Sequence, residues 1–486
     1  MAQRVARRSR RGLHQPRRHR HLHGLRPLWR DRRPAARLPA GDARLLDRRG
    51  HRPLGPRRGV CQGARARRGP AAGGCHRAGC TQVVRPVCEK VNYRLVDTPT
   101  GFQEAAEALA AGRGPFAVDT ERASTFRYGD RAFLIQVQRE DAGTFLIAPE
   151  GHRDDATRAL SPVLNGETWI LHAAASDLPC LSELGLCAGS LFDTEVAARI
   201  AGYQRPNLAN MVERICGVVL EKGHGREDWS KVPLPREWQD YAALDVAYLT
   251  DLADGLAEEL AQTGKLEFAE QEFAYILDTS SSPRTGTGSW RDLKGASRIS
   301  SALSMQLARA LWAAREAQAK RSDRSPSNIL QNRVLVDIAL AQPTTIRDVM
   351  AVPGFPRRRK DLAAACLDVM AEAREQDRST WPTRPKSAPT DVPSKSTMRR
   401  EYPALSEALE AARDKVADLA DALNMEASTI ATTKLLRAAV WKASHSLHPW
   451  DVRRAQQELS ELGARPWQCE LVAPIIAAVG LSAADE

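Results

Sequence analysis

The chain has 486 residues, which is too long for one ordinary domain and predicts two to four. Its formal net charge of +12 would favour a nucleic-acid partner, but the charge is unevenly distributed. Residues 1–90 hold 24 Arg and one Lys against four acidic residues, which leaves +21, whereas the remaining 46 basic and 55 acidic residues give −9. No apolar run reaches the roughly 18 residues of a membrane span. No apolar segment follows the basic start, so we expect no signal peptide either.

The first 90 residues are expected to be disordered. They are rich in Arg, Pro, Gly and His and show neither a helical nor a strand apolar period. Their apolar surface is too small to offset the loss of chain entropy on folding. Two interpretations stay open: a basic arm that binds phosphates, or translation of GC-rich DNA upstream of the true start. The excess of Arg over Lys favours a misassigned start, with the true one between Val83 and Leu95.

The nine cysteines do not suggest disulfides or a zinc site. Four lie in the N-terminal segment without the CxxC spacing of a metal site: Cys61, Cys75, Cys80 and Cys88. The other five are scattered singly on apolar faces and are predicted to be reduced core thiols: Cys180, Cys187, Cys216, Cys366 and Cys469. We therefore expect a cytoplasmic protein.

Residues 91–278 carry the pattern of an α/β domain. Apolar runs predict three strands, close enough together for an antiparallel meander, at 114–121, 132–138 and 144–148. Helix and strand signals then alternate, with a helix at 153–163, a strand at 168–173, a helix at 175–185, another from Thr194 and a long helix at 237–262. The expected architecture is a mixed sheet flanked by helices.

The C-terminal part is predicted to be all helical, in two small domains. A Ser, Gly, Thr and Pro linker at 279–297 precedes the first helical domain, 298–376. A second Pro-rich linker at 377–400 precedes the second, 401–486. The similar size of the two domains hints at a duplicated module.

Acidic side chains mark the candidate site. Asp119 and Glu121 are two apart at the end of a predicted strand, so both leave on one face and lie close enough to share a metal ion. Asp177 follows where a strand ends and a helix begins. Tyr241 and Asp245 are one helical turn apart. A core that gathers unpaired carboxylates is destabilised unless a cation joins them, so the four acids predict a divalent-metal site for phosphodiester cleavage.

Each of these motifs also has an ordinary structural interpretation. The first pair could be a solvated strand end, Asp177 a helix cap, and the Tyr–Asp pair the edge of an apolar stripe. A second Asp-Thr-Glu, Asp193 to Glu195, leads straight into an amphipathic helix and is interpreted as an N-cap followed by a first-turn acid. His172 could contact substrate or be a partly buried histidine at a strand end.

Taken together, the motifs resemble those of the DEDD superfamily of 3′-5′ exonucleases, in the branch with Tyr in its third motif. Residues 95–375 more narrowly resemble ribonuclease D. The matching segments are VDTE with Asp119 and Glu121, HAAASDL with Asp177, and YAALDVAYL with Tyr241 and Asp245.

Two further segments carry the resemblance. Residues 227–246 are similar to the family's approach to the third motif and include Trp229 and Ser230. The helical domain at 298–375 resembles the HRDC module, the helicase and ribonuclease D C-terminal domain, and the second helical domain is similar more loosely. Arg122 departs from the family, where many relatives carry a bulky apolar residue, and Lys231-Val232-Pro233 stands where Arg-Pro is common. We expect neither departure to touch a metal ligand and both to affect substrate contacts.

The resemblance implies a ribonuclease H-like fold that removes nucleoside 5′-monophosphates from RNA 3′ ends. It implies that Asp119, Glu121, Asp177 and Asp245 hold two Mg²⁺ or Mn²⁺ ions, while Tyr241 positions the attacking water. The partner would be RNA with a free 3′ end, such as a transfer RNA precursor, bound by a monomer.

The sequence leaves other functions open. The protein could be a 3′-5′ DNA exonuclease, or a non-catalytic RNA-binding protein with an idle site. The helical domains could mediate protein contacts instead of RNA binding. The basic run 357–360 could contact phosphate or simply begin a solvated helix.

Overall fold

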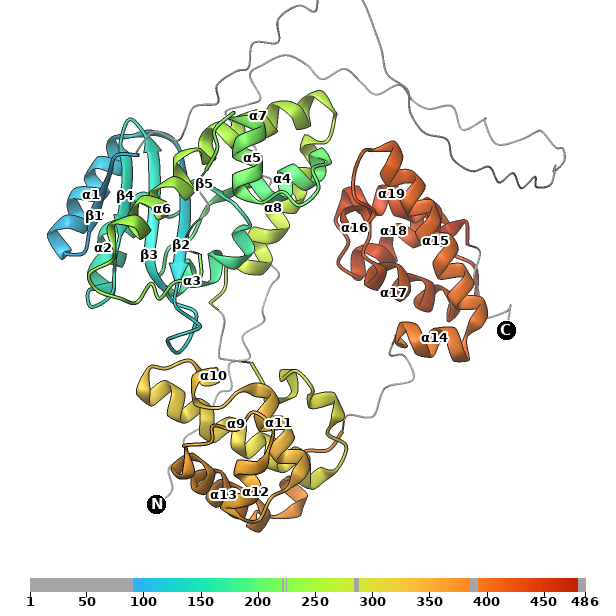
Figure 1. Cartoon of the computed structure of the whole chain (residues 1–486). Helices are drawn as coiled ribbons and strands as arrows, with labels where there is room; N and C mark the ends of the chain where they lie inside the picture. Colours follow the sequence, from blue (N-terminus) through green and yellow to red (C-terminus); the bar gives the residue numbers. More distant parts are fainter. Residues whose placement is uncertain (1–90, 221–222, 224, 284–287, 385–391, 480–486) are drawn as a thin grey trace, which may run out of the picture. The chain divides into compact units, whose positions relative to one another are not determined.

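The computed structural model describes residues 91–479 apart from 221–222, 224, 284–287 and 385–391 (Figure 1). The expectations for residues 1–90, including their disorder, the alternative start and four of the cysteines, lie outside the described residues. Within the described ranges, no helix is both long and apolar enough to cross a membrane.

Six strands form one mixed sheet in the order β1-β4-β3-β2-β5-β6. Their bounds are β1 Tyr93–Val96, β2 Arg113–Arg122, β3 Ala132–Glu140, β4 Gly143–Ile147, β5 Thr168–Leu171 and β6 Ser190–Asp193. The predicted meander is confirmed, because β2, β3 and β4 pair antiparallel. The other three strands pair parallel to their neighbours. Strands β1 and β6 were not predicted, because each is short and has only two consecutive apolar residues, whereas β5, equally short, has three.

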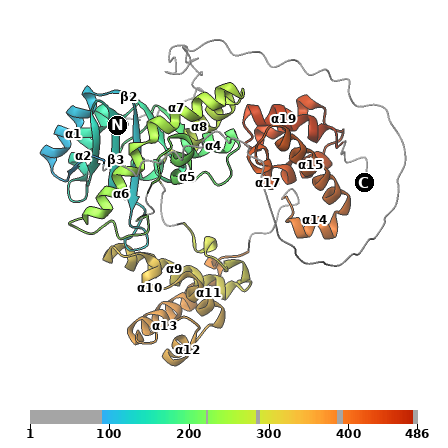
Figure 2. The same ribbon diagram turned by 45° about the horizontal axis from the view of Figure 1, so that its top comes forward.

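Helices surround this sheet. Their bounds are α1 Pro99–Ala111, α2 Arg153–Leu164, the 3₁₀ turn η1 Ala174–Ser176, α3 Leu178–Glu183, α4 Thr194–Ala201, α5 Leu208–Ile215, α6 Arg236–Ala247, α7 Leu249–Gln262 and α8 Leu266–Ser280. Helix α6 packs on β2, β3 and β4 (Figure 2). Trp238, Ala242 and Ala243 of α6 share one buried cluster with Leu134 of β3 and Leu146 of β4.

The long helix predicted at 237–262 is wrong, because the chain forms α6 and α7 with a break at Tyr248, where φ is −113° and ψ is 6°. Helix α6 packs on the sheet, whereas α7 packs mainly on α4, α5 and β5. Because α6 and α7 pack on different surfaces, one straight helix cannot lie on both. The sequence hides the break because the apolar spacing continues through it and neither Gly nor Pro marks it.

Two smaller corrections concern the segment after β5. The predicted strand ends at Leu171, and the predicted helix begins as η1 before α3, because Ala173 adopts a left-handed conformation with φ of 63°.

Cys187 is exposed and Cys216 half-buried, so these two are not core thiols as predicted. Both lie outside helices and strands, Cys187 in the segment between α3 and β6 and Cys216 just after α5. The five described cysteines are free thiols.

The helical part contains two successive groups. The first is α9 Ala302–Ser322, α10 Pro326–Ile329, α11 Asn332–Ala341, α12 Ile346–Ala351 and α13 Lys360–Glu375. The second is α14 Lys395–Glu401, α15 Pro403–Ala422, α16 Ala427–Ile430, α17 Thr433–Ser444, α18 Val452–Glu461 and α19 Pro466–Ala477. From α9 and from α15 onward, both groups run through a long helix, a four-residue helix and three more helices. A duplicated module would give this order, and the duplication itself stays a prediction.

The predicted linkers are shorter than expected. Trp290, Leu293 and Ala296, all within the segment predicted as a linker at 279–297, are buried in the core of the first helical group. Their short 3₁₀ turns, η2 Trp290–Asp292 and η3 Ala296–Arg298, lie among polar residues that mask the apolar ones. Helix α14 likewise begins inside the predicted linker at 377–400. A further turn, η4, spans Arg378–Thr380.

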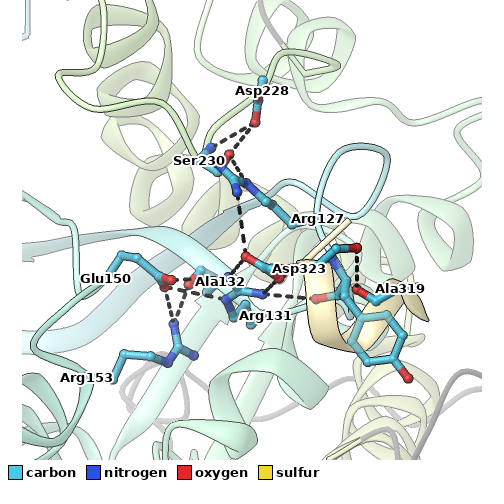
Figure 3. A network of polar contacts seen from close by, with 11 residues as sticks. Arg127, Arg131, Ala132, Glu150, Arg153, Asp228, Ser230, Ala319 and Asp323 are labelled. Carbon is cyan, nitrogen blue, oxygen red and sulfur yellow. Dashed lines mark hydrogen bonds and ion pairs between the residues drawn. The ribbon is translucent and has the colours of Figure 1, made fainter. Parts of the chain in front are cut away.

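Polar contacts hold the loop that follows β2 (Figure 3). Arg127 donates from Nε to Ser230 Oγ at 2.7 Å, and this hydroxyl donates to Asp228 at 2.6 Å (Figure 3). Arg131 pairs with Glu150 after β4 at 3.2 Å (Figure 3). The loop after the first acidic motif is therefore tied both to the segment that leads into α6 and to the end of β4.

Candidate metal centre

Three of the four predicted acids meet in space. Asp119 and Glu121 lie on β2, with side chains on the same face, and Asp245 comes from α6, which covers that strand. One carboxylate oxygen from each of the three lies within 4.8 Å of the others. The prediction that the pair on β2 shares a face and meets the acid of the third motif therefore agrees with the geometry.

Asp177 lies beside this group rather than within it. It stands at the start of α3, yet its side chain makes no capping hydrogen bond. Thr120 Oγ1 instead donates to one of its oxygens at 2.6 Å, and Ser176 Oγ donates to the other at 3.1 Å. The Arg122 guanidinium lies 3.6 Å away. The interpretation of Asp177 as a simple helix cap is therefore not what the structure shows.

The electrostatics of the site call for a cation. Burial, followed by repulsion from the neighbouring acids, raises the pKa of Glu121 to about 9. The same causes raise the pKa of Asp119 well above its usual range, and burial raises the pKa of Asp245. Carboxylates that cannot ionise together without a positive partner, offering oxygen ligands only, fit a hard divalent cation. The residues present therefore match the metal that the sequence predicted.

Tyr241 faces the same group from α6. Its hydroxyl hydrogen-bonds to Asp245, one helical turn away, and the pKa of the phenol is raised because it is buried among the acids. A phenol with a raised pKa stays protonated near neutral pH and acts through hydrogen bonds. The Trp229 ring lies with its centroid 6.4 Å from that of Tyr241, which helps to fix the phenol.

His172 is bound within the protein. Its Nδ1 lies 2.8 Å from Thr194 Oγ1, and the ring also hydrogen-bonds to the backbone of Pro206. Burial lowers the pKa of this imidazole to about 4, so it is neutral at physiological pH. These contacts fit the interpretation as a half-buried histidine at a strand end.

Asp193 does more than the predicted cap. It accepts hydrogen bonds from the backbone N–H groups of Glu195 and Val196, which confirms the cap of α4. It also accepts from Ala173 at 3.1 Å and Ala174 at 2.8 Å. This carboxylate therefore fixes the left-handed residue and the turn that lead to Asp177.

The sequence does not single out two residues that lie beside the acids. Thr120 lies between the two acids of the first motif and binds Asp177, and its place inside the motif was a usable signal. Gln136 lies on β3 directly opposite Asp119. No local pattern could have found this second neighbour, because strand register alone places it there.

Comparisons with protein families match three segments of the chain. Residues 93–261 match a family described as 3′-5′ exonuclease, residues 304–367 match the HRDC domain, and residues 391–479 match a 3′ to 5′ exonuclease C-terminal domain. The second helical group thus matches a family model other than HRDC. Ribonuclease D of Sphingobium indicum is 31% identical over 271 residues, which are 55% of this chain and 68% of that protein. Ribonuclease D of Bartonella henselae is 26% identical over 62% of this chain and 75% of that protein.

Solved structures are similar as well. A protein from Bifidobacterium adolescentis aligns with a TM-score of 0.68 and 29% identity, covering 79% of this chain and 96% of that one. Escherichia coli RNase D aligns with a TM-score of 0.61 and 23% identity, covering 80% and 98% respectively. At that identity, the second likeness shows the fold alone.

Proposed function

Because this chain belongs to the ribonuclease D family of 3′-5′ exoribonucleases, we propose that Asp119, Glu121, Asp177 and Asp245 hold two divalent ions around the scissile phosphate at an RNA 3′ end. The meeting of three carboxylates within 4.8 Å carries this proposal. Bound ions of this kind lower the pKa of a water molecule and stabilise the leaving 3′ oxygen.

Residues of the chain hold the metal ligands in place and orient the attacking water. Asp119 and Glu121 leave from the C-terminal half of β2, where it pairs with β3, and Asp245 leaves from a helix packed on that strand, so the ligands stand on rigid elements. Thr120 and Ser176 fix the Asp177 carboxylate. Tyr241, kept protonated, orients the attacking water by hydrogen bonding. The product is a nucleoside 5′-monophosphate.

We also propose a substrate for this chain, the identity of its ions and its location in the cell. Escherichia coli RNase D is an exoribonuclease involved in structured RNA processing, and we extend that role to this chain, with transfer RNA precursors as substrates. The exposed side chains of Arg357 and Arg358 would contact phosphate. We propose Mg²⁺ or Mn²⁺ as the ions and a monomeric protein. We also propose a cytoplasmic location, which is supported by the free thiols of the five described cysteines.

The test is a time course on 5′-labelled single-stranded RNA with Mn²⁺ or Mg²⁺, using the full-length chain beside the Asp119→Ala/Asp245→Ala double variant. We expect a ladder that shortens one nucleotide at a time from the 3′ end and that EDTA and the double variant abolish. A matched DNA lane separates the alternatives. Digestion of DNA alone would indicate a DNA exonuclease, and no digestion of either by a folded protein would indicate an idle site.

A further inference from the structure

Gln136 is a buried amide without a hydrogen-bond partner. Its side chain on β3 is fully inaccessible, and neither its amide nitrogen nor its oxygen has a hydrogen-bond partner among the described residues. Leaving such a group unsatisfied costs about 1–3 kcal/mol, and native proteins keep few of them. Leu134, two residues earlier on the same face of the strand, shows that an apolar side chain suits this layer.

The strand register decides what this amide faces. Gln136 lies opposite Asp119 on β2 and opposite Leu146 on β4. Directly opposite residues share a face of the sheet, with Cβ atoms about 4.5–5.5 Å apart. Helix α6 covers the same face with Ala242 and Ala243, next to Leu146. Among these neighbours, Asp119 is the polar one.

The chemistry of the two groups determines which one donates the hydrogen bond. An ionised carboxylate only accepts hydrogen bonds, and the Gln amide nitrogen only donates. The amide nitrogen makes no hydrogen bond to Asp119 in this structure, but the Gln side chain is one methylene longer than that of Asp, and a change of its rotamer turns the amide towards the carboxylate on the neighbouring strand. A hydrogen bond to one oxygen of a ligating carboxylate leaves the other for a metal ion and fixes its orientation.

We propose that Gln136 is a positioning residue of the metal site: when Asp119 binds a divalent ion, the Gln136 amide nitrogen donates to that carboxylate and holds it in the orientation that binds the ion. The inference rests on the proposed function and goes beyond it, because it assigns a site role to a residue outside the four acids and the tyrosine. It also explains why the sheet keeps a buried amide where an aliphatic side chain would pack.

The test compares Gln136→Leu with Gln136→Met, which keeps the length of the side chain and removes both polar atoms. The matched control is Gln138→Leu, on the same face two residues later, where the amide is half-buried and bonded to Thr250. Each full-length protein is titrated with Mn²⁺ by calorimetry and unfolded thermally in EDTA. RNA hydrolysis is then followed as a function of Mn²⁺ concentration.

We expect both Gln136 variants to unfold in EDTA at or above the wild-type temperature, while their Mn²⁺ affinity falls by about 10–100-fold. Excess Mn²⁺ should restore the hydrolysis rate, and Gln138→Leu should leave the affinity unchanged. Wild-type Mn²⁺ affinity in Gln136→Met would overturn the inference and leave the proposed function standing. A wild-type protein that binds no Mn²⁺ would overturn both.

Discussion

Arg122 Nη2 lies 3.6 Å from Asp177 Oδ1, so a cation of the chain itself stands beside the acids. Its Nη1 donates to the Ser176 carbonyl at 2.6 Å, which ties the guanidinium to the turn before Asp177. The sequence led us to expect that Arg122 affects substrate contacts and touches no metal ligand, which is wrong for the proposed ligand Asp177. The structure shows that this residue offsets the charge of the one acid that lies outside the group of three.

Arg122→Leu should therefore destabilise the metal-free protein by about 1–3 kcal/mol, because the buried Asp177 carboxylate keeps its hydrogen bonds and loses its positive neighbour. Adding Mn²⁺ should reduce this loss, since the ion supplies the missing charge. Urea denaturation in EDTA and in Mn²⁺ measures both values. Arg113→Leu, which removes an exposed pair with Asp141, is the control and should change little. An equal loss with and without metal would contradict the role assigned to Arg122.

Asp245→Ala should abolish most activity and leave the fold intact. Loss of this proposed metal ligand should slow RNA hydrolysis by about 100-fold or more, because each ion would stabilise charge in the transition state. Without metal the variant should melt at or above the wild-type temperature, since repulsion among the acids is relieved. Hydrolysis at saturating Mn²⁺ and thermal melting in EDTA test the two parts. Asp251→Ala removes an exposed acid of α7 and should behave as the wild type.

Asp193→Ala should cost about 2–4 kcal/mol, because four backbone N–H groups lose their acceptor. Asp193→Asn keeps the oxygen that serves three of them and loses the bond from Ala174, so an intermediate loss is expected. Asp451→Ala is the matched control, since that side chain caps α18 through a single bond from Arg454 and its loss should cost about 1 kcal/mol. Urea denaturation measures all three. Equal losses in the two Ala variants would contradict the additional role of Asp193.

His172 should make the protein sensitive to mild acid. Its pKa of about 4 in the folded protein lies below the ordinary value of 6.5, so the unfolded chain takes up the proton first. Its contribution is complete above pH 6.5 and is lost as the pH falls towards 4, by about 3 kcal/mol in total. The free energy of unfolding, measured from pH 4 to 7, should therefore depend less on pH in His172→Gln than in the wild type. If the free energies of unfolding of the wild type and His172→Gln change in parallel with pH, another group causes the sensitivity to acid.

Much of the fold was readable because its signals are local. The meander, the cap at Asp193 and the amphipathic helices each follow from residue spacings within one element. The break at Tyr248 was not readable, because the packing of α6 and α7 on different surfaces decides it. Trp290 escaped for a related reason, since a buried residue in a polar segment looks like part of a linker.

The sequence by itself determined the chemistry of the site: acids at a strand end, an acid at a helix start, and a tyrosine one turn before an acid are local patterns. Only the tertiary structure decided how these groups are supported. Thr120 meets Asp177 across 57 residues of chain, Gln136 faces Asp119 through strand register, and Asp193 holds the turn at Ala173. Such contacts depend on which strands become neighbours and in which register, and no period within one segment encodes that choice.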